Sequence, residues 1–344
     1  MTKASSTIGV AVLGAGRMGQ EHARNLLGIG NARVVAIADP FQPAREAAQQ
    51  LTRAEKTFAD PLEAIHDPNV DAVIIVTPTN THAELIEAAA RAGKAIFCEK
   101  PVALGLERTR QALEVVKAKG VAFQIGFNRR FDPSYALAKQ KIGADEIGEI
   151  EQFISVMRDP APPALEYLKI SGGMFLDQSI HELDCARFLV GEVEEISAWG
   201  AVLIDPAIGE LGDVDTGMIT MRFKNGALGV IQNSRRSAYG YDVRSEVFGS
   251  KGKLVMEATP KTPLTQFGPG SAKNGRLEQD HFHFFMDRFK DAYRLELEAF
   301  MHCLEMGTIP TPGPFDALES LRLGVAATRS LKEGRPIKLA EITV

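Results

Sequence analysis

The stretch Ile8-Gly-Val-Ala-Val-Leu-Gly-Ala-Gly-Arg-Met-Gly19 decides the fold. Its first six residues form an apolar run of strand length, which is typical of a parallel strand covered on both faces. The glycines that follow have the pattern Gly-x-Gly-x-x-Gly and lead into a predicted helix. In this setting they allow a tight turn, the close approach of a pyrophosphate, and helix–strand packing. The stretch therefore predicts a dinucleotide site at a helix N-terminus.

An acidic residue supports this interpretation. A second predicted strand, Val34–Ala38, ends in Asp39, twenty-three residues beyond Gly16. A carboxylate at about this spacing accepts hydrogen bonds from the adenosine ribose hydroxyls and repels a 2′-phosphate. A glycine motif by itself is often only a tight turn, but the motif and the carboxylate together favour a dinucleotide, NAD rather than NADP.

Strands and helices alternate up to about residue 126. This pattern indicates right-handed parallel crossovers and a doubly wound sheet, whose ligands lie at the carboxyl ends of the strands. Segments 77–82 and 99–101 both fall at such ends. The further predicted strands are 56–58, 71–76, 95–98 and 121–125, and the helices are 20–27, 44–53, 62–66, 82–92 and 104–119.

Beyond residue 126, strands follow one another. They are predicted at 149–157, 193–203, 216–223, 227–233, 242–248 and 253–257, with Asn225-Gly226 as a type I′ hairpin signal. Consecutive strands joined by tight turns imply an antiparallel or mixed sheet. Helices are predicted at 133–142, 174–190, 284–306 and 315–333, and a surface loop at 260–275.

The predicted architecture is therefore an α/β Rossmann dinucleotide-binding domain over residues 1–126 and a second domain over 127–344. The second domain is predicted to be α+β, with a large, mostly antiparallel, open-faced sheet. Its C-terminal helix could pack back on the first domain.

Composition excludes several classes of protein. The 344 residues are 45% hydrophobic and 24% charged, which suits two domains with large cores. The net charge of −5, with no basic stripe, argues against nucleic acid as a partner. The three cysteines are widely spaced in apolar contexts and predict buried thiols, not a disulfide framework or a Cys-rich zinc site. A polar N-terminus and the absence of a long apolar run favour a cytoplasmic protein without a membrane partner.

A second group of titratable residues follows Gly172-Gly173. In a continuous helix, Asp177, His181 and Asp184 would lie within about 40–60° of one another, apart from an apolar face that can pack. An ordinary surface pair of Asp177 and His181 is the alternative.

These motifs together resemble the Gfo/Idh/MocA family of NAD(P)-dependent sugar and polyol oxidoreductases. The resemblance rests on Gly14–Gly19 with Asp39, on Thr77-Pro-Thr-Asn-Thr-His82, on Glu99-Lys100-Pro101 and on Gly172–Asp184. Segments 126–135 and 239–251 are most similar to the inositol 2-dehydrogenase branch. Two positions depart from that branch: Asn128 stands where Met is common, and Gln178 where Thr is common.

The resemblance implies oxidation of a secondary hydroxyl of myo- or scyllo-inositol to the ketone, an inosose. Such a reaction needs a base for the hydroxyl proton while hydride leaves for nicotinamide. We expect His181 to be the base, Asp177 to orient it, and Lys100 to bind the reacting oxygen, with a Lys100–Pro101 bond that is often cis in the family.

The predicted binding residues form two sets. Those expected to bind NAD are Gly14, Ala15, Gly16, Arg17, Met18, Asp39, Thr77, Pro78, Asn80, His82, Glu99 and Lys100. Those expected to bind substrate are Lys100, Asn128, Arg129, Asp177, Gln178, His181, Asp184, Tyr239, His281 and His283. Asn128 and Arg129 could equally belong to a solvated face. His281 and His283 alternate as metal ligands sometimes do, but no Cys or carboxylate cluster accompanies them, so no metal is expected.

Two other functions remain open. An aldose or glucose–fructose type oxidoreductase would keep every motif and differ around Asn128, Gln178 and residues 281–285. An NAD(H)-binding regulator need not keep Lys100, Asp177 and His181 together. The predicted strands 216–223 and 227–232 carry apolar residues on both faces, so we also expect a symmetric dimer through this sheet. The resemblance implies a homotetramer built from such pairs.

Overall fold

A computed structural model describes residues 7–258, 266–267, 276–277 and 281–343. The chain divides into two compact units, each described here by itself. The first unit runs to Phe131 and also contains Asp291–Leu321, and the second contains Asp132–Lys290 and the segment from Arg322 onward. This division differs from the predicted ranges in the position of the boundary and in the return of residues 291–321 to the first unit.

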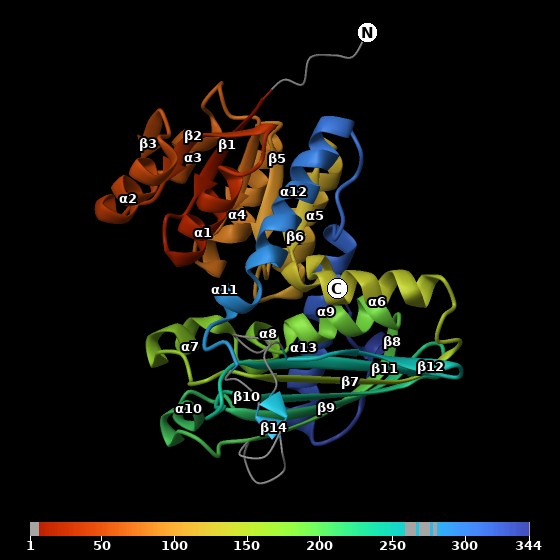
Figure 1. Ribbon diagram of the computed structural model, residues 1–344. Coiled ribbons are helices and arrows are strands. Elements are labelled where there is room, and N and C mark those ends of the chain that lie inside the picture. The colour runs from red at the N-terminus through yellow and green to blue at the C-terminus, as the bar shows by residue number, and fades with distance from the viewer. Residues whose placement is uncertain (1–6, 259–265, 268–275, 278–280, 344) are drawn as a thin grey trace. The chain divides into compact units, whose positions relative to one another are not determined.

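The first unit is built on a six-stranded sheet in the order β3-β2-β1-β4-β5-β6, with every pair parallel (Figure 1). The predicted doubly wound sheet is therefore confirmed. Its order reverses between β1 and β4, which is where such sheets bind nucleotides. The strands are β1 (Ile8–Leu13), β2 (Ala32–Ala38), β3 (Lys56–Phe58), β4 (Ala72–Ile75), β5 (Ala95–Glu99) and β6 (Phe123–Gly126). The connecting helices are α1 (Arg17–Leu26), α2 (Gln42–Thr52), α3 (Pro61–Ile65), α4 (Thr79–Arg91) and α5 (Leu106–Lys119).

Helix α12 (Lys290–Met306) completes the core of the first unit. Its buried residues Leu297, Phe300 and Met301 share one cluster with residues of the central strands and α1. The Phe97 and Phe300 rings lie 6.0 Å apart. Burial of these side chains explains why a segment so late in the sequence belongs to this unit. From the sequence we expected the last helix, and not α12, to pack back on the first domain.

The second unit contains a seven-stranded sheet in the order β12-β11-β7-β10-β9-β8-β15. Only β7 and β10 pair in parallel, so the mostly antiparallel sheet is confirmed. Helices α6 and α9 pack against β12 and β7 on one face (Figure 1). The strands are β7 (Ile150–Arg158), β8 (Val193–Ala201), β9 (Thr216–Phe223), β10 (Leu228–Ser234), β11 (Asp242–Gly249), β12 (Gly252–Met256) and β15 (Ile337–Lys338).

The helices of this part of the chain differ from the prediction. The predicted helix over 174–190 is two helices, α8 (Met174–Asp177) and α9 (Ile180–Leu189), because both Gln178 and Ser179 donate to the Met174 carbonyl and tighten the turn. Helices α7 (Leu165–Ser171) and α10 (Pro206–Glu210) were not predicted. The others are α6 (Pro133–Gly143), α11 (Phe285–Arg288) and α13 (Pro314–Glu333), with short 3₁₀ helices η1 (Asn128–Phe131) and η2 (Leu339–Glu341).

The turn between β9 and β10 is also different. A type I′ turn needs positive φ at both central residues, but in this turn only Gly226 has a positive φ, of 93°. The Gly226 N–H donates to the Phe223 carbonyl at 3.0 Å, which gives a type I turn closed by a left-handed glycine. Most of the predicted loop over 260–275 lies outside the described residues; within it, β13 (Gln266–Phe267) pairs with β14 (Arg276–Leu277).

Among the described residues, no helix combines the length and the apolar character needed to cross a bilayer. Cys98 and Cys185 are buried as predicted, whereas Cys303 is only partly buried.

Candidate active site

The glycine-rich loop has the geometry of a dinucleotide cradle. A Cβ on Gly14 would lie 2.7 Å from the Val76 carbonyl oxygen, and one on Gly19 only 1.9 Å from the Gly14 carbonyl oxygen. These two glycines are therefore required by the packing of the chain. A Cβ on Gly16 would meet no described atom within 4 Å. Gly16 caps α1 at an exposed position, so its backbone stays open to a ligand at the helix N-terminus.

Asp39 ties this loop to the end of β2. Its Oδ2 accepts the Ala15 N–H at 2.6 Å, and its Oδ1 accepts the Phe41 N–H at 2.8 Å. The carboxylate is thus held beside the loop and remains partly exposed. This is the arrangement expected of a ribose-binding acid, and it also gives Asp39 a structural role in the loop.

The segments after β4 and β5 are linked by His82. Its ring nitrogens lie 2.8 Å from the Pro101 carbonyl oxygen and 2.7 Å from the Thr77 carbonyl oxygen. Burial lowers the pKa of His82, although the two carbonyls favour the charged ring. Both ring nitrogens of His82 face backbone carbonyls, so His82 connects these two loops. The sequence had suggested instead that His82 binds the cofactor. Thr77, Pro78 and Asn80 lie at the start of α4.

Lys100 follows β5 directly, and its bond to Pro101 is cis, as expected. The preceding Glu99 uses both carboxylate oxygens: Oε1 lies 2.8 Å from His22 Nε2, and Oε2 accepts the Lys100 N–H at 3.3 Å. Glu99 therefore holds the backbone from which the Lys100 side chain projects.

Asn128 and Arg129 are on η1 and are each only 2% exposed. The solvated face that the Arg-Arg pair could have formed is therefore excluded at Arg129. Arg130, which is also largely buried, lies 2.8 Å from Asp316 of α13.

In the second unit, a buried arginine organises the segment around Asp177. Arg235 is fully buried, and its guanidinium lies 3.7 Å from the Asp177 carboxylate and 3.5 Å from that of Asp213. Asp213 in turn accepts the Met174 N–H at 2.9 Å, at the start of α8. A Cβ on Gly173 would lie 3.0 Å from the Asp213 carboxylate. The glycine pair thus allows a carboxylate to approach the backbone.

Asp177 also accepts a hydrogen bond from Tyr167 of α7, at 2.7 Å. Partial burial and the Asp177 carboxylate raise the pKa of Tyr167, so the phenol stays a donor. His181 lies at the start of α9, after the turn that follows Asp177, and is partly exposed. Asp184 is buried on the same helix.

Gln178 is buried and donates to the Asp159 carboxylate at 2.9 Å and to the Ser234 carbonyl at 3.1 Å. Its Oε1 has no hydrogen-bond partner in the part of the chain that the structure describes. That oxygen is an acceptor suited to a hydroxyl.

The structure also brings Tyr239 and His281 together, with ring centroids 5.6 Å apart in an edge-to-face arrangement. The Tyr239 hydroxyl donates to Asp242 at 2.7 Å and accepts from Arg158 at 2.7 Å. His283 is exposed and shows no such contact within the described ranges.

Tyr167, Asp213 and Arg235 were missed in the sequence. Tyr167 and Arg235 contact the predicted Asp177, and Asp213 lies against Arg235. Tyr167 lies on the unpredicted helix α7, and Arg235 follows a strand in an Arg-Arg pair that reads as a solvated face. No local signal separates a buried arginine from an exposed one, because its partners are 22 and 58 positions away.

Comparison with known proteins agrees with both units. The model of the oxidoreductase family NAD-binding Rossmann fold matches residues 8–127, and that of the oxidoreductase family C-terminal alpha/beta domain matches residues 139–339. Myo-inositol 2-dehydrogenase of Thermotoga maritima is 43% identical over 97% of this chain and 99% of its own. The scyllo-inositol 2-dehydrogenase (NAD(+)) of Bacillus subtilis is 42% identical over 96% of this chain and 95% of its own.

A solved structure is similar over the same length. Scyllo-inositol dehydrogenase from Lactobacillus casei, with bound cofactor NAD(H) and scyllo-inositol, superposes with a TM-score of 0.90 at 29% identity, covering 97% of this chain and 100% of the other. The chain therefore belongs to the Gfo/Idh/MocA oxidoreductase family, with an NAD-binding Rossmann domain followed by the family's C-terminal α/β domain.

Proposed function

We propose that this oxidoreductase uses NAD to oxidise one secondary hydroxyl of a cyclic polyol, myo- or scyllo-inositol, to the ketone. The observation that carries the proposal is the held carboxylate of Asp177, fixed by Tyr167 and Arg235 just before His181. Relatives at 42–43% identity that are named inositol 2-dehydrogenases support the substrate class. The same proposal places the enzyme in the cytoplasm.

The residues of the glycine-rich loop fit NAD, because Gly16 leaves the helix N-terminus open and Asp39 stands beside it. When bound, NAD supplies the acceptor for the hydride that leaves the carbinol carbon. His181 takes the hydroxyl proton, since an imidazole is suited to this near neutral pH. Lys100 donates to the reacting oxygen and favours its alkoxide-like form.

Asp177 orients His181 and stabilises the charge that the imidazole gains. Its own position is supported by the Tyr167 hydroxyl, at 2.7 Å, and by the Arg235 guanidinium, at 3.7 Å. Gln178, Asp184, Tyr239 and His281 are assigned to substrate hydroxyls, and Asn128 and Arg129 to the same role in the first unit.

The first prediction tests the base and the reacting-oxygen ligand. His181→Ala should lower kcat by about 10²–10⁴-fold while NAD binding is largely kept, because the base acts only on the alcohol. Lys100→Met should reduce kcat comparably and also raise the KM for polyol. Initial rates of NADH formation and NAD titration by fluorescence measure the two effects.

His302→Ala is the matched control, because His302 is exposed on α12. It should leave both constants unchanged. Near-normal turnover in His181→Ala would remove His181 as the base. A screen of inositol isomers and aldoses with NAD and NADP decides the substrate class, and a preference for an aldose would replace inositol by a sugar.

A further inference from the structure

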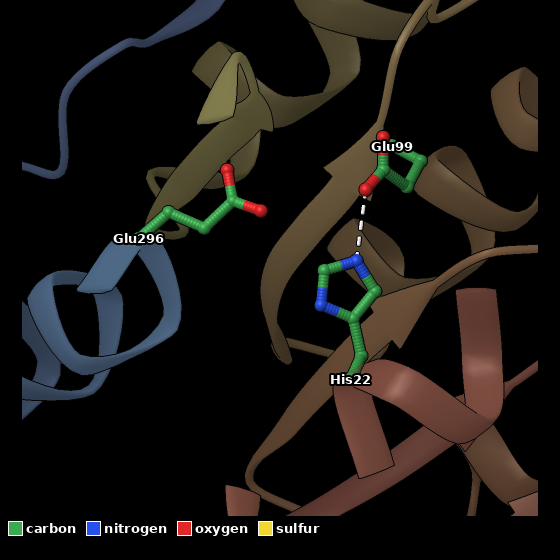
Figure 2. Close-up of side chains that lie close together, drawn as sticks. All are labelled: His22, Glu99 and Glu296. Carbon is green, nitrogen blue, oxygen red and sulfur yellow. Dashed lines mark hydrogen bonds and ion pairs between the residues drawn. The ribbon is translucent and has the colours of Figure 1, made fainter. Parts of the chain in front are cut away.

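A buried group of three titratable side chains lies inside the first unit and includes Glu99, the residue before Lys100. His22 of α1, Glu99 at the end of β5 and Glu296 of α12 form this buried cluster (Figure 2). One ligand-type atom from each lies within 4.8 Å of the others. His22 and Glu296 are completely buried, and Glu99 is partly buried.

The Glu99 carboxylate is the fixed member of the buried cluster. It lies 2.8 Å from His22 Nε2 and accepts the Lys100 N–H at 3.3 Å. A Cβ on Gly126 would lie 3.1 Å from its Oε2, so the glycine in β6 lets the carboxylate lie against the strand. His22 Nδ1, on the other side of the ring, has no hydrogen-bond partner among the described residues.

Glu296 is the unexplained member. Neither of its carboxylate oxygens has a hydrogen-bond partner within the described parts of the chain. Its side chain points toward His22 and Glu99 (Figure 2). Two uncharged side chains also lie close to the buried cluster: the Tyr293 ring is 5.8 Å from that of His22, and Gln124 donates to the Glu296 backbone carbonyl at 3.0 Å.

Two ionised carboxylates cannot both be stable in this environment. Burial and the neighbouring Glu99 carboxylate raise the pKa of Glu296 well above its usual value. Glu99 has hydrogen-bond contacts to His22 and to the Lys100 N–H, whereas Glu296 has none among the described residues. A protonated Glu296 gains a hydroxyl that can donate toward His22 or Glu99, whose atoms lie within 4.8 Å.

We propose that Glu296 is a positioning residue for Lys100: as a buried neutral acid it supports His22 and Glu99, and through Glu99 it fixes the backbone of Lys100. The effect of Glu296 on turnover rests on the proposed function, since it assumes that Lys100 binds the reacting oxygen. The protonation of Glu296 is independent of that function.

A divalent cation is the competing explanation of such a cluster. If His22 Nε2 keeps its contact with Glu99, His22 can offer an ion only Nδ1, beside carboxylate oxygens of Glu99 and Glu296. An ion would then compete with the Lys100 N–H and with His22 for the Glu99 carboxylate. The neutral acid accounts for the same atoms without an ion.

The test compares Glu296→Gln, Glu296→Leu and a control, Glu298→Gln, on the partly exposed face of the same helix. Infrared spectroscopy of the metal-free protein in ²H₂O at neutral pH should show a protonated carboxyl band in the unmodified protein and in Glu298→Gln. The band should be missing in Glu296→Gln. Absence of the band from the unmodified protein would overturn the proposal. So would a metal analysis that finds one equivalent of divalent metal in the unmodified protein and none in Glu296→Gln.

Thermal unfolding gives a second readout. A raised pKa in the folded state means that stability falls as pH rises above the unfolded value of 4.5 toward the folded pKa. The melting temperature of Glu296→Gln should therefore rise relative to the unmodified protein between about pH 4.5 and 8, whereas Glu298→Gln should run parallel to it. A constant difference for Glu296→Gln would contradict a neutral Glu296.

Kinetics test the positioning role. Glu296→Gln keeps a donor and should retain kcat within about twofold, whereas Glu296→Leu should lower kcat by roughly 10–100-fold, as displacements of about 1 Å do. ADP-ribose affinity should be unchanged in both. Normal turnover of folded Glu296→Leu would overturn the positioning role, and if Lys100→Met were also fully active, the proposed function itself would have failed.

If Glu296→Leu does not fold, the comparison of Glu296→Gln with Glu298→Gln replaces it. Equal turnover of these two variants at all pH values supports the proposal, and a loss of turnover in Glu296→Gln alone contradicts it.

Discussion

At the scale of single residues, Asp39 has two roles that a substitution can separate. Its carboxylate accepts the Ala15 and Phe41 N–H groups, and its charge opposes a 2′-phosphate. Asp39→Asn removes the charge and keeps one of the two acceptor oxygens, so it also gives up one of the two backbone hydrogen bonds. We expect the ratio of kcat/KM for NAD to that for NADP to fall at least about tenfold, which corresponds to about 1.4 kcal/mol.

Asp60→Asn is the control for this experiment. Asp60 also accepts a backbone N–H, that of Leu62 at 2.8 Å, but it does so at the start of α3. It should not change the cofactor ratio. Equal use of NAD and NADP by the unmodified protein, or an unchanged ratio in Asp39→Asn, would show that Asp39 serves only the loop.

At the scale of elements, we expect opposite effects from substitutions at Gly16, which caps α1, and at Gly19, in its first turn. Gly16→Ala should leave the melting temperature nearly unchanged, because the new Cβ meets no described atom within 4 Å. It should raise the KM for NAD more than about tenfold by obstructing the pyrophosphate. Gly19→Ala should instead destabilise the fold by at least about 1–3 kcal/mol, because its Cβ would lie 1.9 Å from the Gly14 carbonyl oxygen.

Each variant is the control for the other, and thermal unfolding with NAD titration measures both. A destabilised Gly16→Ala with normal NAD affinity would mean that Gly16 is required by the turn alone. A fully stable Gly19→Ala would contradict the close approach of α1 to β1.

Elements with a strong local pattern could be predicted from the sequence, and those defined by distant contacts could not. The alternation up to residue 126 gave the doubly wound, parallel character of the first sheet, because apolar runs and glycine turns are local. The break after Asp177 was missed, since the apolar periodicity continues across Gln178 and Ser179. Helix α12 was assigned to the second unit, because amphipathic periodicity shows that a helix has an apolar face and not which core that face joins.

The same distinction applies to the site. Short-range signals mark the glycines, Asp39 and Glu99-Lys100-Pro101. The structure places the Asp39 carboxylate against the glycine-rich loop. Asp177 is held by two residues from other elements. Tyr167 comes from α7, and Arg235 directly follows β10. Their role depends on burial and long-range pairing, which composition and spacing do not encode.

At the scale of the whole molecule, the sheet of the second unit has one face without helices in Figure 1. On this open face Trp199 is 71% exposed and pairs in register with Met218, which is 47% exposed. Leu228, Phe248 and Val255 add exposed apolar side chains on neighbouring strands. An apolar surface of this kind favours burial against a second copy, so we propose a symmetric dimer through the open face and a tetramer of two such dimers.

Trp199 is the only tryptophan in the chain, so its fluorescence reports directly on this assembly. The unmodified protein should have a mass near two or four times 37.3 kDa by light scattering, with Trp199 shielded from a soluble quencher. Met218→Glu places a charge opposite Trp199 and retains the fluorophore. It should reduce the mass to that of a smaller assembly and make Trp199 accessible to the quencher.

Ile309→Glu provides the comparison, because Ile309 is 90% exposed but belongs to the first unit. It should change neither mass nor quenching, since a general effect of added charge would appear in both variants. A concentration-independent monomer of 37.3 kDa in the unmodified protein would exclude the assembly altogether. An oligomer whose mass and Trp199 quenching survive Met218→Glu would place the interface on another surface, because a buried unpaired carboxylate at the centre of the open face would be strongly unfavourable.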